Sequence, residues 1–220
     1  MRNAGAVAVA VAMCLWALSA CAAAEAPPTR HLIYLHGRIV QDEQSARPRH
    51  PQFGYYEMEK ILAAFRERGF VVSAKIRAKS ASVSDSADQV IEEVRGLLES
   101  GVPADHVTVV GASMGASIAL VASARLQNPD VRYCVLGACL SENVRALLAD
   151  ERQGPSGHVL SIREASDDVT RSCAPWNSDL ESQFPFVARE LVLGTGLGHG
   201  FLYRPLPEWV DPIVEWAGVR

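Results

Sequence analysis

A serine at a sharp glycine turn is the residue of this chain best suited to covalent chemistry. Residues 107–127 read VTVVGASMGASIALVASARLQ, in which a β-branched run leads through Gly-x-Ser-x-Gly into a helical pattern. This strand-turn-helix form is typical of a nucleophile elbow, which presents its serine at the tip of the turn. The N–H groups at the start of the helix favour negative charge beside the serine. We therefore predict that Ser113 is a nucleophile.

A serine hydroxyl is a weak nucleophile near neutral pH unless a base removes its proton, and the usual base is histidine. Residues 190–203 read ELVLGTGLGHGFLY, an apolar strand followed by a glycine-rich loop that holds His199. A histidine in such a loop, just beyond the end of a strand, can reach a nucleophile on another strand. We predict that His199 is the base.

Two carboxylates could orient that histidine. Residues 158–169 read HVLSIREASDDV, a strand that ends in Asp167 and Asp168. One of the two could accept the Nδ1 proton of His199 and thereby fix the tautomer of the ring. The other would cap the next segment. The residues alone leave both assignments open.

The chain order Ser113, Asp167, His199, each just past a strand, resembles the α/β-hydrolase superfamily. The resemblance covers about residues 31–217. It implies a catalytic triad, and it favours Asp167 over Asp168 because the acid of this superfamily usually lies a few residues past its strand.

The resemblance also implies an oxyanion hole. Residues 31–38 read HLIYLHGR, with His36 and Gly37 where such hydrolases keep their oxyanion loop. By similarity, the backbone N–H groups of Arg38 and Met114 would hold the tetrahedral oxyanion. We expect the His36 imidazole to bind loop backbone, which makes His36 and Gly37 supports of that loop.

Helical and strand patterns alternate along the whole region. Strands are predicted at 31–35, 70–76, 106–110, 131–137, 158–163 and 190–194, and helices at 56–68, 86–99, 115–127, 142–149 and 208–216. Apolar strands that alternate with amphipathic helices form a parallel sheet covered on both faces. The predicted fold class is α/β: a three-layer α/β/α sandwich with a mostly parallel sheet of about six strands, a minimal α/β-hydrolase fold.

The resemblance bears on substrate size, because the cap of this superfamily usually follows the strand at 131–137. Only residues 138–157 are available there, too few for a cap domain. We expect the loop 38–55 to wall the pocket instead, since it is too long for a plain connector. Its polar residues Arg47, Arg49 and His50 either meet an anionic substrate group or are simply solvated.

The first twenty residues predict export. A single Arg2 precedes an apolar run too short for a stable membrane span, as in a secretory signal peptide. The run ends in LSAC, which resembles a bacterial lipobox with Cys21 as the lipidated first mature residue. The predicted organisation is a signal peptide 1–20, a linker 21–30 and a hydrolase domain 31–220. This implies an outer-membrane lipoprotein facing the periplasm, or a soluble periplasmic or secreted protein if cleavage falls within 22–24.

Composition and motifs limit the binding partners and cofactors that we expect for this protein. A net charge of −4 and a pI near 5.9 give no electrostatic basis for nucleic-acid binding. No metal or nucleotide motif is present, so no cofactor is expected. Cys134 lies in a predicted strand as a small apolar residue, whereas Cys139 and Cys173 follow neighbouring strands and either pair or stay reduced.

These expectations combine into one hypothesis: an exported serine hydrolase that cleaves a carboxylic ester or related acyl bond of a small molecule. An amidase or peptidase would use the same triad. A non-catalytic envelope binding lipoprotein on a hydrolase scaffold is the alternative from another class, since fold does not fix function. Contact with the membrane is expected only through Cys21, and the sequence does not predict the oligomeric state.

Overall fold

The computed structural model of this 220-residue chain describes residues 29–138, 146, 148, 154–170 and 186–219. The predicted signal peptide, Cys21, Cys139, Cys173 and most of the predicted helix 142–149 lie outside the described residues. The export, lipidation and disulfide hypotheses therefore stay predictions of the sequence.

A six-stranded sheet forms the centre of the described chain, and its strand order is β4-β1-β5-β6-β7-β8. The strands are β1 (Arg30–Leu35), β4 (Phe70–Ala74), β5 (Val107–Ala112), β6 (Arg132–Leu136), β7 (Gly157–Glu164) and β8 (Phe186–Leu193). All neighbouring pairs are parallel. The predicted α/β class and the predicted count of about six strands are confirmed.

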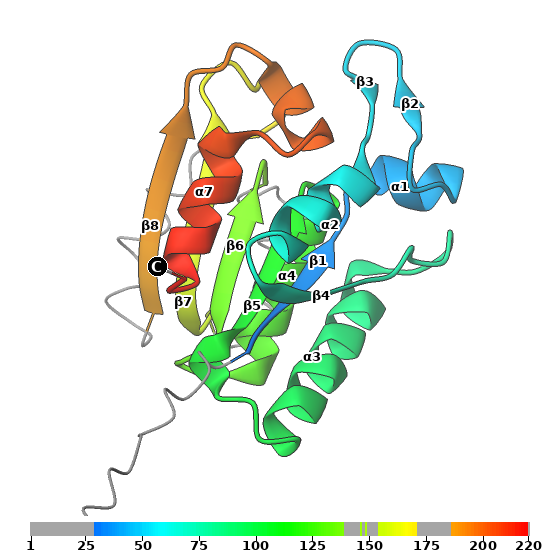
Figure 1. The fold of residues 1–220 in the computed structure, drawn as a ribbon. Coiled ribbons are helices and arrows are strands. Elements are labelled where there is room, and N and C mark those ends of the chain that lie inside the picture. The colour runs from blue at the N-terminus through cyan, green and yellow to red at the C-terminus, as the bar shows by residue number, and fades with distance from the viewer. Residues whose placement is uncertain (1–28, 139–145, 147, 149–153, 171–185, 220) are drawn as a thin grey trace, which may run out of the picture.

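Helices cover both faces of the sheet, as Figure 1 shows. The helices α2 (Met58–Arg66) and α7 (Pro207–Trp216) lie on one face, and α3 (Val83–Glu99) and α4 (Met114–Leu126) on the other. Alternate side chains of β1 enter the two cores: Leu32 and Tyr34 pack under α2 and α7, Ile33 and Leu35 under α3 and α4. The period-two alternation of a strand therefore supplies both apolar layers.

The helix α3 begins three residues before its predicted start at residue 86 because a serine caps it. The Ser82 hydroxyl accepts a hydrogen bond from the N–H of Asp85 at 3.0 Å, satisfying a donor that has no partner within the helix. Val90, Ile91 and Val94 then form the buried face. This apolar spacing is what indicated a helix from the sequence.

The segment 38–55 was predicted to be one long loop, and this prediction is wrong. It contains the short helix α1 (Arg38–Glu43) and a hairpin of β2 (Arg49–His50) and β3 (Gly54–Tyr55). The helix ends at Gln44, whose amide Nε2 donates to the carbonyls of Gln41 at 2.6 Å and Arg77 at 2.9 Å. The bond to Arg77 joins residues far apart in the sequence, so local pattern could not predict this helix end.

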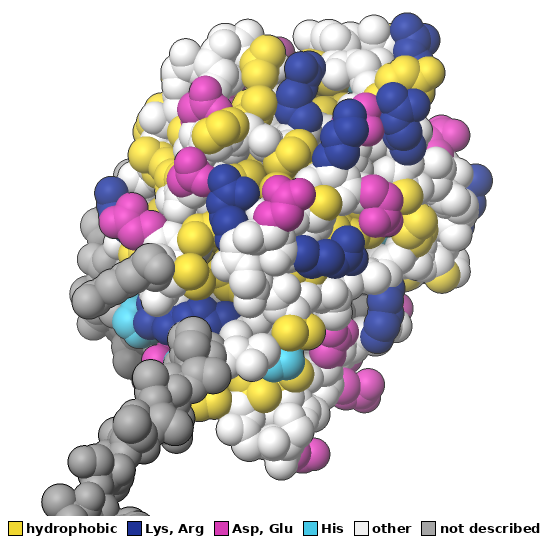
Figure 2. Space-filling view, viewed as in Figure 1, with side chains coloured by type: hydrophobic (Ala, Val, Ile, Leu, Met, Phe, Trp, Pro, Cys, Tyr) yellow, Lys and Arg dark blue, Asp and Glu magenta, His cyan; other side chains and the backbone are white. Residues whose placement is uncertain are grey.

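The face that carries α2 and α7 has no large area of one charge. Lys and Arg side chains are interspersed there with Asp and Glu side chains (Figure 2). Across the described ranges, no helix combines the length and the apolar character needed to cross a membrane.

The contact between α4 and the sheet yields a stability prediction. A Cβ added at Gly115 would lie 2.0 Å from the carbonyl oxygen of Leu35, which is backbone and has little freedom to move. We expect Gly115→Ala to lower the free energy of unfolding by about 3 kcal/mol through overpacking, measured from the urea midpoint. Gly96→Ala, in α3, is the matched control because nothing lies within 4 Å of its added Cβ. The control should gain about 0.5–1 kcal/mol from helix propensity, and a Gly115→Ala variant as stable as the wild type would contradict the prediction.

Candidate active site

The serine of the Gly-x-Ser-x-Gly motif lies at a strained turn between β5 and α4. Ser113 has φ 52° and ψ −116°, a conformation that residues other than glycine rarely adopt. Its N–H donates to the carbonyl of Leu136 at the end of β6 at 2.8 Å, which fixes the turn to the neighbouring strand. A Cβ at Gly111 would lie 2.3 Å from the Gly115 carbonyl oxygen, so the first glycine of the motif is required by the closeness of strand and helix.

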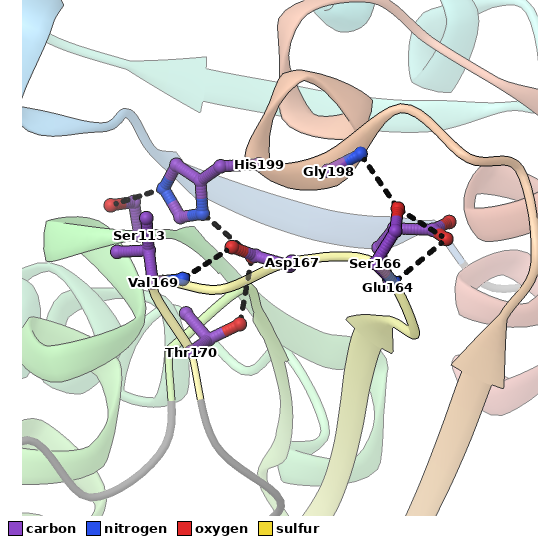
Figure 3. A network of polar contacts seen from close by, with 8 residues as sticks. All are labelled: Ser113, Glu164, Ser166, Asp167, Val169, Thr170, Gly198 and His199. Atoms are coloured by element: carbon purple, nitrogen blue, oxygen red, sulfur yellow. Dashed lines mark hydrogen bonds and ion pairs between the residues drawn. The ribbon is translucent and has the colours of Figure 1, made fainter.

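The histidine loop brings His199 to this serine. His199 lies in the short helix η2 (Gly198–Tyr203), which follows β8, and its Nε2 is 3.0 Å from Ser113 Oγ. The carboxyl ends of β5 and β8 lie at the same edge of the parallel sheet, so residues 86 positions apart in the chain meet there. Figure 3 shows this contact.

Asp167 holds the other side of the imidazole. Its Oδ2 lies 2.7 Å from His199 Nδ1, and the Asp167 side chain is fully buried. The same carboxylate accepts hydrogen bonds from the N–H of Val169 at 2.9 Å and the hydroxyl of Thr170 at 2.7 Å. An ionised carboxylate can only accept, so the proton of a neutral His199 sits on Nδ1. Nε2 is then free to accept the proton of Ser113.

Of the two candidate acids, the structure brings Asp167 and not Asp168 to the histidine. Asp168 is exposed, one residue further along the loop after β7. The turn that orients Asp167 is stabilised locally, because the Asp167 carboxylate accepts a hydrogen bond from the N–H of Val169, two residues later in the chain.

The loop after β1 lies beside the serine. A Cβ added at Gly37 would be 3.6 Å from Ser113 Cβ. Arg38 is the first residue of α1 and Met114 the first residue of α4. The N–H groups of first-turn residues have no partner inside their helices, which leaves both available to a ligand.

His36 supports this loop in a neutral form. Its Nε2 accepts from the N–H of Arg77 at 3.1 Å, so its proton lies on Nδ1, 2.9 Å from the Gly37 carbonyl oxygen. Burial, reinforced by the charge of Arg77, lowers the pKa of His36 to about 4. The imidazole is therefore uncharged near neutral pH and binds loop backbone on both sides.

Arg77 is a supporting residue that the sequence did not indicate. Its Nη2 donates to the His36 carbonyl at 2.6 Å and its Nε to Gln41 Oε1 at 3.0 Å. The guanidinium is buried, its Nη1 has no partner among the residues that the structure describes, and burial lowers the pKa of Arg77 to about 10. An arginine after a strand ordinarily points into solvent, so only the fold shows that it links the end of β4 to α1 and the loop after β1.

The hairpin of β2 and β3 reaches the histidine loop. The Phe53 ring stacks on His50 at a centroid distance of 4.5 Å and lies 6.5 Å from the His199 ring. A Cβ at Gly200 would be only 2.9 Å from Phe53 Cδ1, so the hairpin packs directly against η2. The two other polar candidates of this segment take different places. Arg47 forms an ion pair with Glu57 at 3.0 Å and lies over the ring of Tyr55, and Arg49 is exposed in β2.

Other candidate groups lie away from this site. Cys134 is buried and free in β6, and burial raises the pKa of its thiol well above the usual range. Within the described ranges, no group of three or more His, Cys, Asp or Glu side chains could hold a metal ion.

Comparisons of sequence find no counterpart: no family model and no curated protein matches the chain. Comparisons of structure find similar proteins. One of the metagenome-derived lipolytic enzymes LipS and LipT aligns with a TM-score of 0.59 and 11% identity over 88% of this chain and 96% of that chain. A fungal esterase from Rhizomucor miehei aligns with a TM-score of 0.57 and 14% identity over 87% of this chain and 73% of that chain.

A third similar structure is covered by the alignment over nearly its whole length. It comes from Xanthomonas campestris, is described as a hydrolase of the alpha/beta superfamily, and aligns with a TM-score of 0.53 and 15% identity over 86% of this chain and 95% of that chain. At such identities the similarity is one of fold, and the fold is the same in all three. The described chain has the fold of the α/β-hydrolase superfamily.

Proposed function

We propose that this protein is a serine hydrolase that cleaves a carboxylic ester, or a related acyl bond, of a small molecule. The observation that carries the proposal is the hydrogen-bonded series Ser113, His199, Asp167 at the carboxyl edge of the sheet. The strained backbone of Ser113 supports it, because strain of this kind is retained where function requires it.

The geometry supports the two-step chemistry of acyl transfer. Ser113 Oγ attacks the ester carbonyl carbon while His199 Nε2 takes the hydroxyl proton, and Asp167 stabilises the resulting imidazolium. The tetrahedral intermediate collapses when His199 returns that proton to the leaving alkoxide, which breaks the ester C–O bond and leaves an acyl-serine. Water then attacks the acyl-serine by the same route and releases the acid.

The oxyanion would be held by backbone rather than by side chains. In this proposal the N–H groups of Met114 and Arg38 donate to the oxygen that becomes negative. Removing one such donor typically costs about 3–4 kcal/mol of transition-state stabilisation. The neutral imidazole of His36 and the Arg77 guanidinium would hold the second donor in place through loop backbone.

The wall beside the triad supports a small substrate. Phe53 of the β2–β3 hairpin packs against η2 next to His199, so the hairpin brings segment 38–55 to the histidine side of the triad. A short wall of this kind encloses a compact acyl or alcohol group, and a long chain would gain little binding energy beyond it.

Replacing the proposed nucleophile tests the assignment directly. Ser113→Ala should abolish covalent labelling by a fluorophosphonate and reduce turnover of a short p-nitrophenyl ester by about 10⁴-fold or more. Alanine removes only the attacking oxygen, so the thermal midpoint should change little. Equal labelling of the wild type and the variant, read by intact mass, would refute the role of Ser113.

The two neighbouring aspartates provide a matched pair. Asp167→Asn should lower kcat by about 10⁴-fold, because an amide can donate to Nδ1 and so favours the wrong imidazole tautomer. Asp168→Asn, which alters an exposed side chain in the same loop, should keep kcat within about twofold, since surface substitutions rarely disturb a site. Comparison of the two kcat values under saturating ester shows which aspartate orients His199, and the reverse ranking would assign that role to Asp168.

Substrate length is the third test. Esters with acyl chains of about two to six carbons should have a much higher kcat/KM than esters of about sixteen carbons, because the proposed short wall would leave the distal carbons without contacts. Phe53→Ala should raise KM for the short esters by removing part of the wall. A clear preference for the long chains would contradict a small-molecule esterase and indicate a lipase.

A further inference from the structure

A second buried carboxylate lies close to the triad and takes no part in the chemistry just described. Glu164 is the last residue of β7 and is only 1% exposed. Its Oε2 accepts from the N–H of Thr195 at 2.9 Å and from the Thr195 hydroxyl at 2.7 Å. Its Oε1 accepts from the N–H of Gly196 at 3.2 Å and from the hydroxyl and N–H of Ser166 at 3.2 and 3.4 Å.

These hydrogen bonds keep the buried group ionised. Burial by itself would raise the pKa of Glu164, but the bonds from Thr195, Ser166 and Gly196 outweigh it and lower the pKa below its usual value. Backbone N–H groups and hydroxyls that surround a carboxylate make charge-assisted hydrogen bonds, which are about twice as strong as neutral ones.

The partners of Glu164 belong to two loops that carry different members of the triad. Ser166 precedes Asp167 in the loop after β7, whereas Thr195 and Gly196 precede His199 in the loop after β8. Two further bonds join the same loops: the N–H of Gly198 donates to Ser166 Oγ at 3.0 Å, and the N–H of Ala165 donates to the Leu193 carbonyl at 2.8 Å. Figure 3 shows Glu164, Ser166 and Gly198 beside Asp167 and His199.

We propose that Glu164 is a positioning residue, whose carboxylate fixes the His199 loop against the Asp167 loop and so sets the distance between the imidazole and its acid. The proposal rests on the function proposed above. The segment 194–198 that leads to His199 contains Gly194, Gly196 and Gly198, which offer no side chains to pack, so hydrogen bonds must hold it in place. Displacement of a reacting group by about 1 Å can cost about 100-fold in rate, so a loose loop would lower kcat while the substrate wall is unchanged.

Glu164→Gln is the informative variant because it keeps the shape of the side chain and removes the charge. The glutamine NH₂ has no lone pair to offer, so at least one of the N–H groups of Thr195 and Gly196 loses its acceptor. We expect kcat per active site to fall about 10- to 100-fold, with KM for a short p-nitrophenyl ester within about threefold. Active sites are counted by fluorophosphonate titration, so that unfolded molecules do not lower the measured kcat.

Glu190→Gln is the matched control. Glu190 lies on β8, pairs with Ser161 of β7, and its carboxylate is 3.5 Å from Arg163 Nε. The substitution therefore removes a mostly buried carboxylate from the same two strands and leaves the hydrogen bonds of Glu164 in place. This control should keep kcat per active site within about twofold, as expected for a substitution away from the reacting groups. An equal fall in both variants, or an unchanged kcat in folded Glu164→Gln, would overturn the proposal.

A spectroscopic measurement separates positioning from stability. The proton shared by His199 Nδ1 and Asp167 gives a low-field ¹H resonance when that hydrogen bond is short and protected. The resonance should be present in the wild type and in Glu190→Gln, and broadened or lost in Glu164→Gln. Its retention unchanged in Glu164→Gln would overturn the proposal. If the wild type neither labels with a fluorophosphonate nor cleaves the ester, the proposed hydrolase function fails, while this resonance still tests whether Glu164 sets the geometry.

Thr195 provides the test if Glu164→Gln does not fold. Thr195→Ser keeps the hydroxyl that donates to Glu164, whereas Thr195→Val keeps the shape and loses the donor. We expect the serine variant to retain kcat and the valine variant to lose about tenfold in kcat with little change in KM. Equal kcat values in the two variants would overturn the proposal.

Discussion

The close approach of α4 to β1 and β5 is the constraint on which the rest of the site depends. At Gly115 the helix backbone lies so near the Leu35 carbonyl that no side chain fits, and at Gly111 the strand is equally close to the helix. The chain must therefore reverse within one residue, and that residue, Ser113, takes a positive φ. The serine hydroxyl is presented at the edge of the sheet because the backbone there has no wider turn available.

Asp167 lies in the loop after β7, and His199 lies in the short helix η2 that follows the loop after β8. Such segments beyond the ends of strands need restraints that a sheet does not. Two buried polar groups supply them on opposite sides of the serine. Arg77 binds the His36 carbonyl and Gln41 beside the proposed oxyanion loop, and Glu164 binds N–H and hydroxyl groups beside the histidine loop. The acceptors bound by Arg77 are buried, and a buried polar group without a partner would cost about 1–3 kcal/mol. The bonds to Glu164 are partly buried and join the loops after β7 and β8.

Arg77 and Glu164 differ in charge as well as in position. A cation lies near the loop proposed to hold the oxyanion, and an anion lies near the loop that carries the histidine, which becomes positive during the proposed reaction. The positive charge of Arg77 therefore complements the proposed oxyanion, and the negative charge of Glu164 complements the imidazolium expected on His199. The neutral state of His36 fits the same arrangement, since its N–H and its lone pair are both used by backbone.

The sequence by itself determined the type and order of the elements, because apolar periodicity and the glycine-serine-glycine turn are local signals. The predicted α/β sandwich is confirmed, and ten of the predicted helices and strands, five on each side of Ser113, begin or end within a few residues of their observed bounds. Only the tertiary structure showed that Asp167, and not Asp168, lies against His199, since both follow their strand in a loop where strand alternation no longer says which way a side chain points. It alone revealed the supporting roles of Glu164 and Arg77, whose partners lie 31 and 41 residues away in the sequence. The segment 38–55 was misread as a loop for the same reason: α1 ends where Gln44 meets the Arg77 carbonyl, and such a long-range contact leaves no periodicity in the residues that make it.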